Sequence, residues 1–551
     1  MAANTSAGVY TREIDKSVRI EAASTSIGAI VGASDRGPVG ARVLVTSERQ
    51  FLDTFGTPSP EVSQLHYHAL AFLGESKQLY VTRVVANDNT ALTAGAYLTV
   101  DDILATRPVL HLTNFDAGTN VTTPLGKFDP FNTLLIDPLS PGAANILGFF
   151  CAANPGLWNN RISIRIRPNM RLGTTIPDDP FTFHVEVYMD YVSVRQSPDE
   201  SFLVSRDYRT DGFGRQMNIE DVINLKSKLI RYRANAAAPM IGVFSAIQVL
   251  LSGAATGSAV GDGAVSNGWE LYRDPELVDV NILINGNYAS PAVHMKMDDI
   301  AQSRGDCISV LDIPVDAQAL QAALDYRNVI LNLDSSCSAL YAPHILVQDK
   351  FNDRKVMISP SGHVAAAYAR TDAQKALWFA PAGINRGTVN AIGVGAVYNQ
   401  GDRDALASAQ INTIRVIPGA GYKIWGADTL QAQASALSNV NVRRLLCFIK
   451  KSVSIAALYG VYAPNTFVLR AELKDMVDRF LAPIKAGSGL YSFHVQCDDV
   501  NNPPEIVATG DVNLDVYLDP TIPAKRIGLN AIVTKTGANF KEMAAALATG
   551  G

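Results

Sequence analysis

The sequence predicts a multidomain protein of mixed α/β and α+β class, and three observations carry this prediction. First, its 551 residues exceed what one hydrophobic core organises, since domains usually hold about 100–200 residues. Second, strand and helix patterns alternate near the N-terminus and again in the middle of the chain. Third, the last third combines two long amphipathic helices with a strictly alternating strand. We therefore expect an α/β core domain interrupted by a β-rich insertion and followed by an α+β C-terminal domain.

The first α/β segment opens with a predicted strand at residues 27–31 and closes with another at residues 77–85. Between them, a capping box, a proline in a first helical turn and two terminating glycines predict two short helices. The residues that mark these helices are Ser47, Gln50, Gly56, Ser59, Pro60 and Gly74.

Residues 91–264 have a different texture and predict the β-rich insertion. Short alternating runs, such as residues 161–167 and 181–194, are separated by clusters of Pro, Gly and Asp. A helix is predicted over residues 218–233. The Gly, Ala and Ser-rich stretch at residues 253–268 is typical of a loop at a domain boundary.

The α/β pattern then returns, with the uninterrupted apolar runs of strands that are covered on both faces. We expect residues 23–90 and 265–350 to form one α/β domain, because a shared sheet buries strands that neither half covers alone. The predicted strands are residues 278–284, 307–312 and 338–347, and the predicted helices are residues 291–303 and 316–331.

Residues 351–524 are predicted to form the α+β C-terminal domain. Its first long helix carries an apolar face, and its second is expected to be capped at Asn465. The run from Asp511 to Asp519 alternates, which places three aspartates on one face of a strand and apolar residues on the other. The apolar positions are Val442, Leu445, Leu446, Ile449 and Val453 in the first helix, Leu473, Met476, Val477, Phe480 and Ile484 in the second, and Val512, Leu514, Val516 and Leu518 in the strand.

Composition argues against several function classes. The 47 Lys and Arg residues against 52 Asp and Glu leave a net charge of −5, so no overall field favours nucleic acid or an anionic membrane. The start of the sequence lacks a leader pattern, and no later stretch approaches the length of an apolar span, so we expect a soluble protein made in the cytosol. The five scattered cysteines are typical of buried thiols in a reducing compartment.

Catalytic and ligand-binding motifs are weak. The sequence has no P-loop, nucleophile elbow or zinc-protease motif. His66 and His68 are two apart on a predicted helix, which favours an exposed amphipathic surface over a shared metal. His494 and Cys497 are expected on opposite faces of a strand, and the aspartates at 511, 515 and 519 are too widely spaced for a calcium site. We expect no catalytic residue, no cofactor and no metal.

Long strings at both ends of the chain resemble the tail sheath proteins of contractile-tailed bacteriophages, part of the sheath family of contractile injection systems. Together they are far more specific than any single motif, whereas residues 91–264 carry only a faint resemblance around residues 158–163. The strings are Gly8–Asp15, Ser24–Gly32, Arg36–Pro38, Leu79–Arg83, Cys307–Asp312, Ser359–Asp372, Trp378–Ala382, Ile411–Gly419, Tyr422–Gly426 and Asn441–Leu445.

The resemblance implies a structural subunit that forms stacked hexameric rings around an inner tail tube. Contraction of this helical polymer would drive the tube through a bacterial envelope for genome ejection. The implied partners are further copies of the chain, the inner tail tube protein, and baseplate and tail terminator proteins, with no direct nucleic acid contact and no membrane insertion. The implied location is the virion tail, reached by assembly in the host cytoplasm.

Extended segments before the first core strand and after the last domain predict two arms, residues 1–22 and 525–551. Such arms suit addition of a strand to the sheet edge of a neighbouring subunit. The residues predicted at this interface, arms and acceptor strand together, are Val9, Tyr10, Arg12, Glu13, Ile14, Val512, Leu514, Val516, Ile527, Leu529 and Ile532.

Three alternatives stay open at this stage. An α/β enzyme would use Asp279 and Asp312, which lie in or at the end of predicted strands where such folds place their sites. A tube, baseplate or capsid-type protein is a second structural possibility. A sheath of a headless, bacteriocin-like contractile particle is the third, and capsid and terminase genes beside the coding sequence would distinguish a phage from it.

Overall fold

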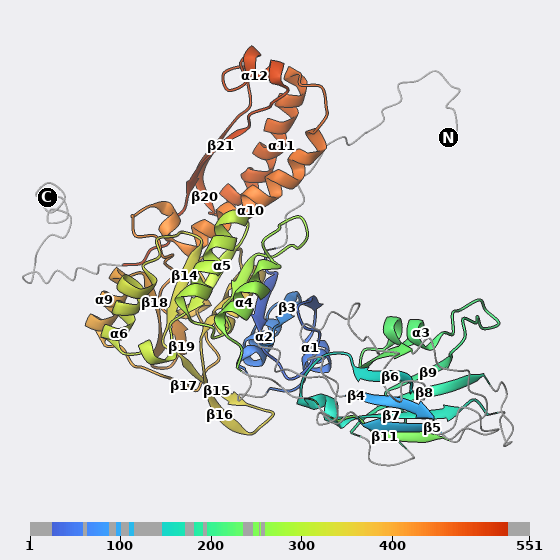
Figure 1. The fold of residues 1–551 in the computed structure, drawn as a ribbon. Coiled ribbons are helices and arrows are strands. Elements are labelled where there is room, and N and C mark those ends of the chain that lie inside the picture. The colour runs from blue at the N-terminus through green and yellow to red at the C-terminus, as the bar shows by residue number, and fades with distance from the viewer. Residues whose placement is uncertain are drawn as a thin grey trace, which may run out of the picture.

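The computed structural model describes residues 25–58, 63–86, 95–100, 110–114, 146–170, 181–190, 196–234, 246–252, 254 and 259–526. A central α/β unit lies between a β-rich insertion on one side and a narrow unit of two long helices and two strands that projects from it (Figure 1). The mixed α/β class is confirmed. The predicted arms lie outside these residues, apart from the last residues before position 527.

An eight-stranded sheet, the central sheet, organises the α/β unit in the order β19-β18-β14-β13-β12-β1-β3-β2. The six inner strands are parallel, and both edge strands are antiparallel to their neighbours. The strands are β1 (Gly28–Gly32), β2 (Arg42–Val45), β3 (Leu79–Arg83), β12 (Ile282–Ile284), β13 (Ile308–Asp312), β14 (Ser338–Ala342), β18 (Ile411–Ile417) and β19 (Gly421–Ile424).

Two segments of the chain separated by the insertion meet where β1 pairs with β12, Gly28 opposite Ile282. The sheet continues past β14 into β18 and β19, which lie beyond the boundary predicted at residue 350. That boundary therefore cuts through the sheet. Local patterns place a strand but do not say which sheet it joins, because pairing partners are remote in sequence.

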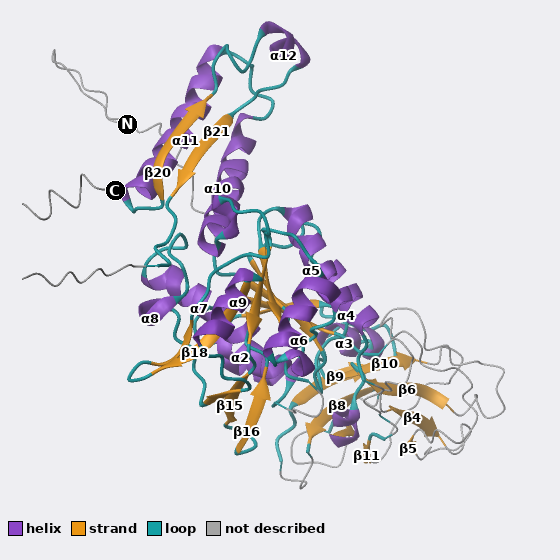
Figure 2. Ribbon diagram, turned by 90° about the vertical axis from the view of Figure 1, so that its left-hand side faces the viewer, coloured by secondary structure: helices purple, strands orange, loops and turns teal. Residues whose placement is uncertain are grey.

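Helices cover both faces of the central sheet, which is why every residue of β1, β12, β13 and β14 is buried (Figure 2). Side chains of α1, α2 and α7 share one hydrophobic core with strand residues such as Ile30, and those of α4, α5, α6 and α9 share a second core with Val31. The helices are α1 (Glu48–Phe55), α2 (Leu65–Leu73), α4 (Asp262–Glu270), α5 (Pro291–Arg304), α6 (Leu320–Asp325), α7 (Ser361–Gln374), α8 (Gly383–Arg386) and α9 (Gln400–Ser408).

Several predicted boundaries are corrected here. Helix α2 starts at Leu65 rather than at residue 59. The helix predicted over residues 316–331 is broken into a 3-10 turn (Val315–Ala317), α6 and a π-helical turn (Tyr326–Leu331). The strand predicted over residues 338–347 is divided at Pro343, which has no N–H to donate, into β14 and β15 (Ile345–Asp349). β15 forms a small sheet with β16 (Arg354–Ile358) and β17 (Gly393–Val394).

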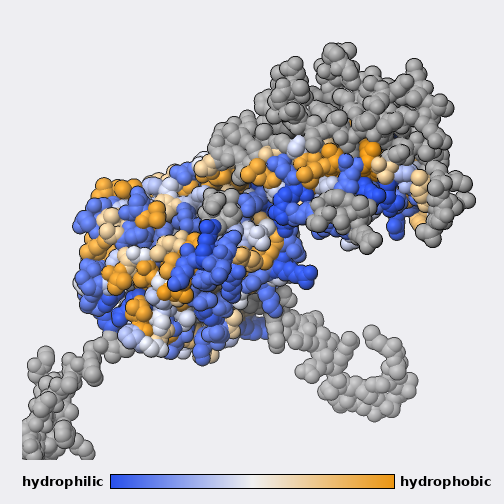
Figure 3. Space-filling view, turned by 90° about the horizontal axis from the view of Figure 1, so that it is seen from below, coloured by the Kyte–Doolittle hydropathy of each residue, from blue (hydrophilic) through white to orange (hydrophobic). Residues whose placement is uncertain are grey.

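The insertion contains two four-stranded sheets around a separate core, in the orders β10-β6-β4-β5 and β11-β7-β8-β9. Figure 3 shows an apolar band along this part of the molecule. Its elements are β4 (Gly95–Val100), β5 (Leu110–Asn114), β6 (Ile146–Ala152), a 3-10 turn (Leu157–Arg161), β7 (Ile162–Pro168), β8 (Thr182–Met189), β9 (Glu200–Ser205), α3 (Ile219–Lys226), β10 (Ile230–Ala234) and β11 (Ile247–Leu250).

Two predictions in this region are wrong. The helix predicted over residues 218–233 ends at Lys226, and the chain turns at Ser227, whose hydroxyl accepts from the backbone N–H of Ile230 at 3.0 Å. The residues that follow form β10, which pairs with β6. The loop predicted over residues 253–268 contains most of α4, a helix that buries Trp269 in the central unit.

Arg83, at the end of β3, joins the insertion to the central unit. Its guanidinium is buried and donates to the backbone oxygens of Ser34 at 2.8 Å, Gly37 at 2.9 Å and Asp35 at 3.2 Å. A fourth bond, of 2.8 Å, reaches the backbone oxygen of Pro155 in the insertion. One buried cation with four hydrogen bonds therefore ties the loop after β1 to the segment after β6.

The C-terminal unit consists of α10 (Val440–Ala457), a 3-10 turn (Leu458–Gly460), α11 (Phe467–Ala486), β20 (Leu490–Gln496), α12 (Pro504–Thr509) and β21 (Asp515–Pro520). A further 3-10 turn (Ala436–Ser438) precedes it. Helix α11 is capped by Thr466, whose hydroxyl accepts from Leu469 N–H, rather than by Asn465 as predicted. In the described part of the chain, no helix is long and apolar enough to cross a membrane.

Candidate assembly site

The C-terminal unit presents a two-stranded antiparallel sheet, β20 and β21, with α11 packed against it. Val495 opposes Val516 and Phe493 opposes Leu518 in the register of this sheet. Within the described residues neither strand has a second neighbour, so both outer edges carry unpaired backbone N–H and C=O groups. Such edges are places where a further strand can pair.

The side chains that were predicted at the acceptor strand point toward their own chain. Leu514 and Val516 are half-buried and pack on the core that α10 and α11 share with β20. Val512 packs on a smaller cluster with Leu473 and Met476. These apolar residues therefore stabilise the C-terminal unit, and the backbone of the strand edge is left unpaired.

The alternating run from Asp511 to Asp519 forms a shorter strand than predicted, because asparagine side chains take up the backbone groups at its start. The backbone N–H of Asn513 donates to Asn502 Oδ1 at 2.6 Å, and the Asn513 carbonyl accepts from Asn501 and Asn502 at 3.1 and 2.9 Å. The regular edge of β21 therefore begins at Asp515.

The arm residues predicted to add strands to this sheet lie outside the described residues. They are Val9, Tyr10, Arg12, Glu13, Ile14, Ile527, Leu529 and Ile532.

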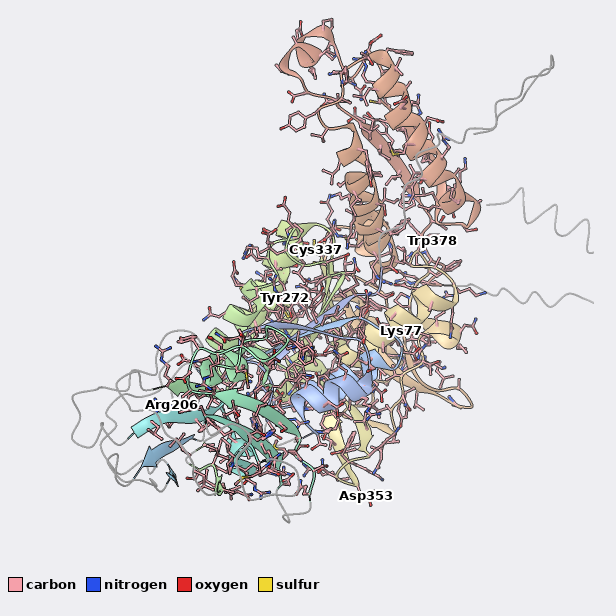
Figure 4. All side chains as sticks on the ribbon, turned by 90° about the vertical axis from the view of Figure 1, so that its right-hand side faces the viewer. Lys77, Arg206, Tyr272, Cys337, Asp353 and Trp378 are labelled. Atoms are coloured by element: carbon pink, nitrogen blue, oxygen red, sulfur yellow. The ribbon has the colours of Figure 1, made fainter. Side chains whose placement is uncertain are left out.

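The C-terminal unit meets the central unit at a joint that contains Trp378 and Cys337 (Figure 4). Trp378 donates from Nε1 to the Gly487 carbonyl at 2.8 Å, and the amide of Asn441 donates to the Trp378 carbonyl at 3.0 Å. Arg443 and Arg444 of α10 are also buried here. The sequence interpretation missed both, although two adjacent arginines inside an apolar helix face are a signal for buried charge partners.

Asp312, one of the two residues an enzyme would need, lies at the end of β13 and is completely buried. Its carboxylate accepts from the backbone N–H of Ser361 at 2.7 Å and from the hydroxyl of Ser359 at 2.8 Å. Burial raises its pKa, while these hydrogen bonds act in the opposite direction. The contacts hold the first turn of α7, whose N-terminus favours a negative charge, against the sheet.

His68 completes this buried cluster and corrects the prediction of an exposed helix surface. Both His66 and His68 are buried: α7 packs directly over α2 and covers His68, whereas His66 packs against α1, with its Nε2 3.2 Å from the Phe55 carbonyl oxygen. His68 Nδ1 accepts from the backbone N–H of Gly362 at 3.1 Å, and Nε2 lies 3.2 Å from Ser359 Oγ. Burial lowers the pKa of His68 to about 3, so the ring is neutral.

Ser359 contacts both His68 and Asp312, but the order of contacts differs from a hydrolase triad, because Ser359 Oγ itself donates to Asp312 and His68 Nδ1 accepts from the backbone N–H of Gly362. All three side chains are closed to solvent. A substrate therefore has no path to Ser359 Oγ. The second residue that an enzyme would use, Asp279, is ion-paired with Lys451 of α10. The geometry assigns both aspartates to packing: Asp312 fixes α7, and Asp279 contacts the C-terminal unit.

The remaining candidate ligands do not converge. His494 is exposed on β20 while Cys497 is buried, and no group of three or more potential metal-ligating side chains occurs in the described parts of the chain. Asp515 and Asp519 accept hydrogen bonds from Asn501 and Ser492 within the same unit. These carboxylates have local partners.

Comparison with solved structures defines the fold. The sheath tail protein from Listeria innocua superposes with a TM-score of 0.57 at 10% identity, over 91% of this chain and 96% of that chain. The sheath of an extracellular contractile injection system, the PVC complex in its contracted state, superposes with a TM-score of 0.53 at 14% identity, over 98% of this chain and 100% of that chain. The fold is that of sheath subunits.

Sequence comparison then narrows the class. Residues 266–430 match the family model of the phage tail sheath protein central domain. The tail sheath protein of Vibrio phage KVP40 is 30% identical over 302 residues, which are 50% of this chain and 45% of that protein. The tail sheath protein of Enterobacteria phage T4 is 29% identical over 322 residues, 54% of this chain and 49% of that protein. The predicted relationship to tail sheath proteins is confirmed, and the chain spans about half the length of these curated relatives.

Proposed function

We propose that this chain is the structural subunit of a contractile tail sheath that polymerises as stacked hexameric rings around an inner tail tube. The observation that carries the proposal is the sheath central domain at residues 266–430 joined to a C-terminal sheet with two open edges. A subunit of this kind needs no catalytic site, since its function is to bind copies of itself and to change their arrangement.

Assembly would proceed by strand addition. Residues 1–22 and 525–551 of neighbouring copies would pair with the outer edges of β20 and β21, giving main-chain hydrogen bonds along each edge. The same patch is not used on both sides of such a contact. Head-to-tail contacts of this type propagate into rings and helices rather than closing as a dimer.

Contraction would be a rigid-body rearrangement of the lattice. The extended sheath would be kinetically trapped, and the contracted sheath would bury more surface. A gain of a few kcal/mol per subunit, the scale of ordinary two-state switches, becomes large when summed over a helical array. The resulting motion would drive the inner tube through a bacterial envelope.

The proposed partners are the inner tail tube protein, the baseplate and the tail terminator, in addition to further copies of the chain. The proposed location is the virion tail, after assembly in the host cytoplasm. A headless contractile particle would use the same subunit in the same way. Solved sheath structures with this fold include one from an extracellular contractile injection system, and this favours keeping the headless particle as a second candidate.

Negative-stain electron microscopy of the purified full chain tests the proposal. We expect long tubes, and we expect their loss on deletion of residues 1–20 or of residues 531–551 while circular dichroism shows a folded core. Ile14→Asp should also prevent tube formation, because it adds a charge at a position proposed to pair. Ser17→Asp, which adds the same charge outside that run, is the matched control. Persistent monomers with intact arms would overturn self-assembly as the function.

A further inference from the structure

A buried ion pair holds α10 of the C-terminal unit against α7 of the central unit. Arg444 donates to both carboxylate oxygens of Asp372, at 2.9 and 2.5 Å, and each side chain is only 5% exposed. The Arg444 guanidinium also lies 4.9 Å from the centre of the Tyr368 ring. A bidentate pair that also stacks on an aromatic ring has one well-defined geometry.

The first described residues of the chain bind the same pair. Ser26 donates from its hydroxyl to Asp372 Oδ2 at 3.0 Å, and Arg444 Nη2 lies 3.4 Å from the Thr25 carbonyl oxygen. These residues directly precede β1, whose neighbour Ile27 donates from its backbone N–H to Asn281 Oδ1 at 3.3 Å. We call Arg444, Asp372, Thr25 and Ser26 the Arg444 junction.

A small cavity adjoins the Arg444 junction. Thr25 and Arg444 line it together with Cys307, Cys447 and Phe448. Cys447 lies on α10 and Cys307 directly before β13, with the Cys447 thiol 3.8 Å from the Cys307 carbonyl oxygen. Both thiols are buried, so they mark the contact between the C-terminal unit and the central sheet.

We infer that the Arg444 junction couples the start of the folded chain to the C-terminal unit, so that displacement of Ser26 from Asp372 loosens α10 on the central sheet. The coupling arises because Asp372 serves both groups at once. When the Ser26 hydroxyl leaves, the carboxylate loses a partner in a buried position. Removing one member of such a cluster weakens the others, since each remaining polar group is left less well satisfied.

The Arg444 junction would also link neighbouring subunits, and this step rests on the proposed function. If a neighbouring subunit holds residues 1–22, then a pull on that segment acts on Thr25 and Ser26 and is transmitted to α10 through Arg444 and Asp372. The orientation of the C-terminal unit would thereby respond to the position of the neighbour. The coupling itself is a property of a single chain, and it is tested on full-length protein that carries Ile14→Asp, the substitution expected to prevent tube formation.

Thiol labelling with a maleimide, followed by peptide mass spectrometry, measures opening at the joint in the full-length chain. When closing is faster than labelling, the rate at each cysteine reports the population of its open state. Ser26→Ala should raise labelling at Cys447 and Cys307 about ten-fold, the value of one hydrogen bond to a charged group. Arg444→Lys should raise it further, because lysine cannot make the bidentate contact.

Two other cysteines distinguish joint opening from unfolding. Cys151 is buried in the insertion and Cys497 within the C-terminal unit, so neither should change in these variants. Arg479→Lys, at an exposed ion pair on α11, is the control substitution. The reciprocal result is faster hydrogen exchange at the Ile27 amide in Arg444→Lys. Unchanged labelling in Ser26→Ala, or an equal increase at all cysteines, would overturn the coupling. Neither result depends on whether tubes form.

Discussion

Acidification from pH 7 to pH 5 is expected to destabilise the central unit through three buried histidines. Burial is the main cause that lowers the pKa of His66 to about 4 and those of His68 and His294 to about 3. Removal from water keeps each ring neutral, and at His66 it outweighs the contact of Nε2 with the Phe55 carbonyl oxygen at 3.2 Å, which favours the charged ring. His68 accepts from a backbone N–H, and His294 Nδ1 lies 2.9 Å from the hydroxyl of Tyr326.

The direction of the effect follows from proton binding. In the unfolded chain these histidines titrate near the ordinary pKa of about 6.5, so between about pH 6.5 and pH 4 the unfolded state binds protons that the folded state does not. The stability that the neutral rings allow is therefore lost as the pH falls through this window. Below pH 6.5, each histidine lowers the free energy of unfolding by about 1.4 kcal/mol per pH unit. At pH 5 the loss is about 2 kcal/mol for each histidine and about 6 kcal/mol for the three together.

A loss of this size is comparable with the whole stability of a domain, about 5–15 kcal/mol. Urea unfolding of the unassembled chain, followed by tryptophan fluorescence at pH 7, 6 and 5, measures it. Trp269 is buried in the same core as Tyr326, the hydrogen-bond partner of His294, and reports on the central unit. His294→Gln should recover about 2 kcal/mol of the loss at pH 5.

The control for this experiment is His494→Gln, because His494 is exposed on β20 and its removal should leave the pH dependence unchanged. Equal unfolding free energies at pH 7 and pH 5 would refute the reasoning. So would a loss at pH 5 that is the same with and without His294, since the linkage would then arise from other groups.

Three further predictions concern packing. Asp312→Asn should lower the free energy of unfolding, measured in urea, by about 1–3 kcal/mol, because one accepting oxygen becomes a donor in a buried site. An unchanged free energy of unfolding would contradict the assigned hydrogen bonds. Gly362→Ala should lower the free energy of unfolding by about 1–3 kcal/mol, since a Cβ there would lie 2.5 Å from the Cα of His68. The control is Gly401→Ala, where the atom nearest to an added Cβ is 3.4 Å away, and it should leave the free energy of unfolding unchanged or raise it by up to about 1 kcal/mol. Arg83→Lys should lower the free energy of unfolding by about 1.5–3 kcal/mol and speed hydrogen exchange around residues 154–158. Unchanged exchange there would show that this side chain does not anchor the insertion.

Sequence patterns located elements best where both ends carry local markers. Ser47 accepts from the backbone N–H of Gln50 at 3.3 Å, and Gly56 ends α1 with a φ of 87°, as the capping pattern predicted. Helix α5 likewise begins after Ser290 with Pro291 in its first turn. Capping depends on residues within one turn of each other, so the information is present in a short window.

Patterns failed where tertiary contacts decide between two local conformations. Residues 230–233 lie within the predicted helix, yet they pair with β6 and form most of β10. The residues of β18 lie within the predicted C-terminal domain, and only their pairing with β14 assigns them to the central sheet. Strand partners separated by tens of residues leave no mark in a local window.

In the candidate site, too, some features follow from local sequence patterns and others depend on remote contacts. The alternation of Val512, Leu514 and Val516 predicted a half-buried strand, and their inward packing agrees with that pattern. The buried position of His68, by contrast, depends on α7 covering α2 at Gly362, about 300 residues further along the chain. An exposed helix face and a buried one look alike when the covering element is remote.

The sequence by itself determined the class of the protein, the capped helices, the alternating strand of the C-terminal unit and the resemblance to tail sheath proteins. These properties depend on residue type and short spacing. Only the tertiary structure decided which strands share the central sheet, which polar groups are buried, and that Arg444, Asp372 and Ser26 meet. Buried charges acquire partners from segments remote in sequence, because removing a charge from water is favourable only where folding brings its counterpart within hydrogen-bonding distance.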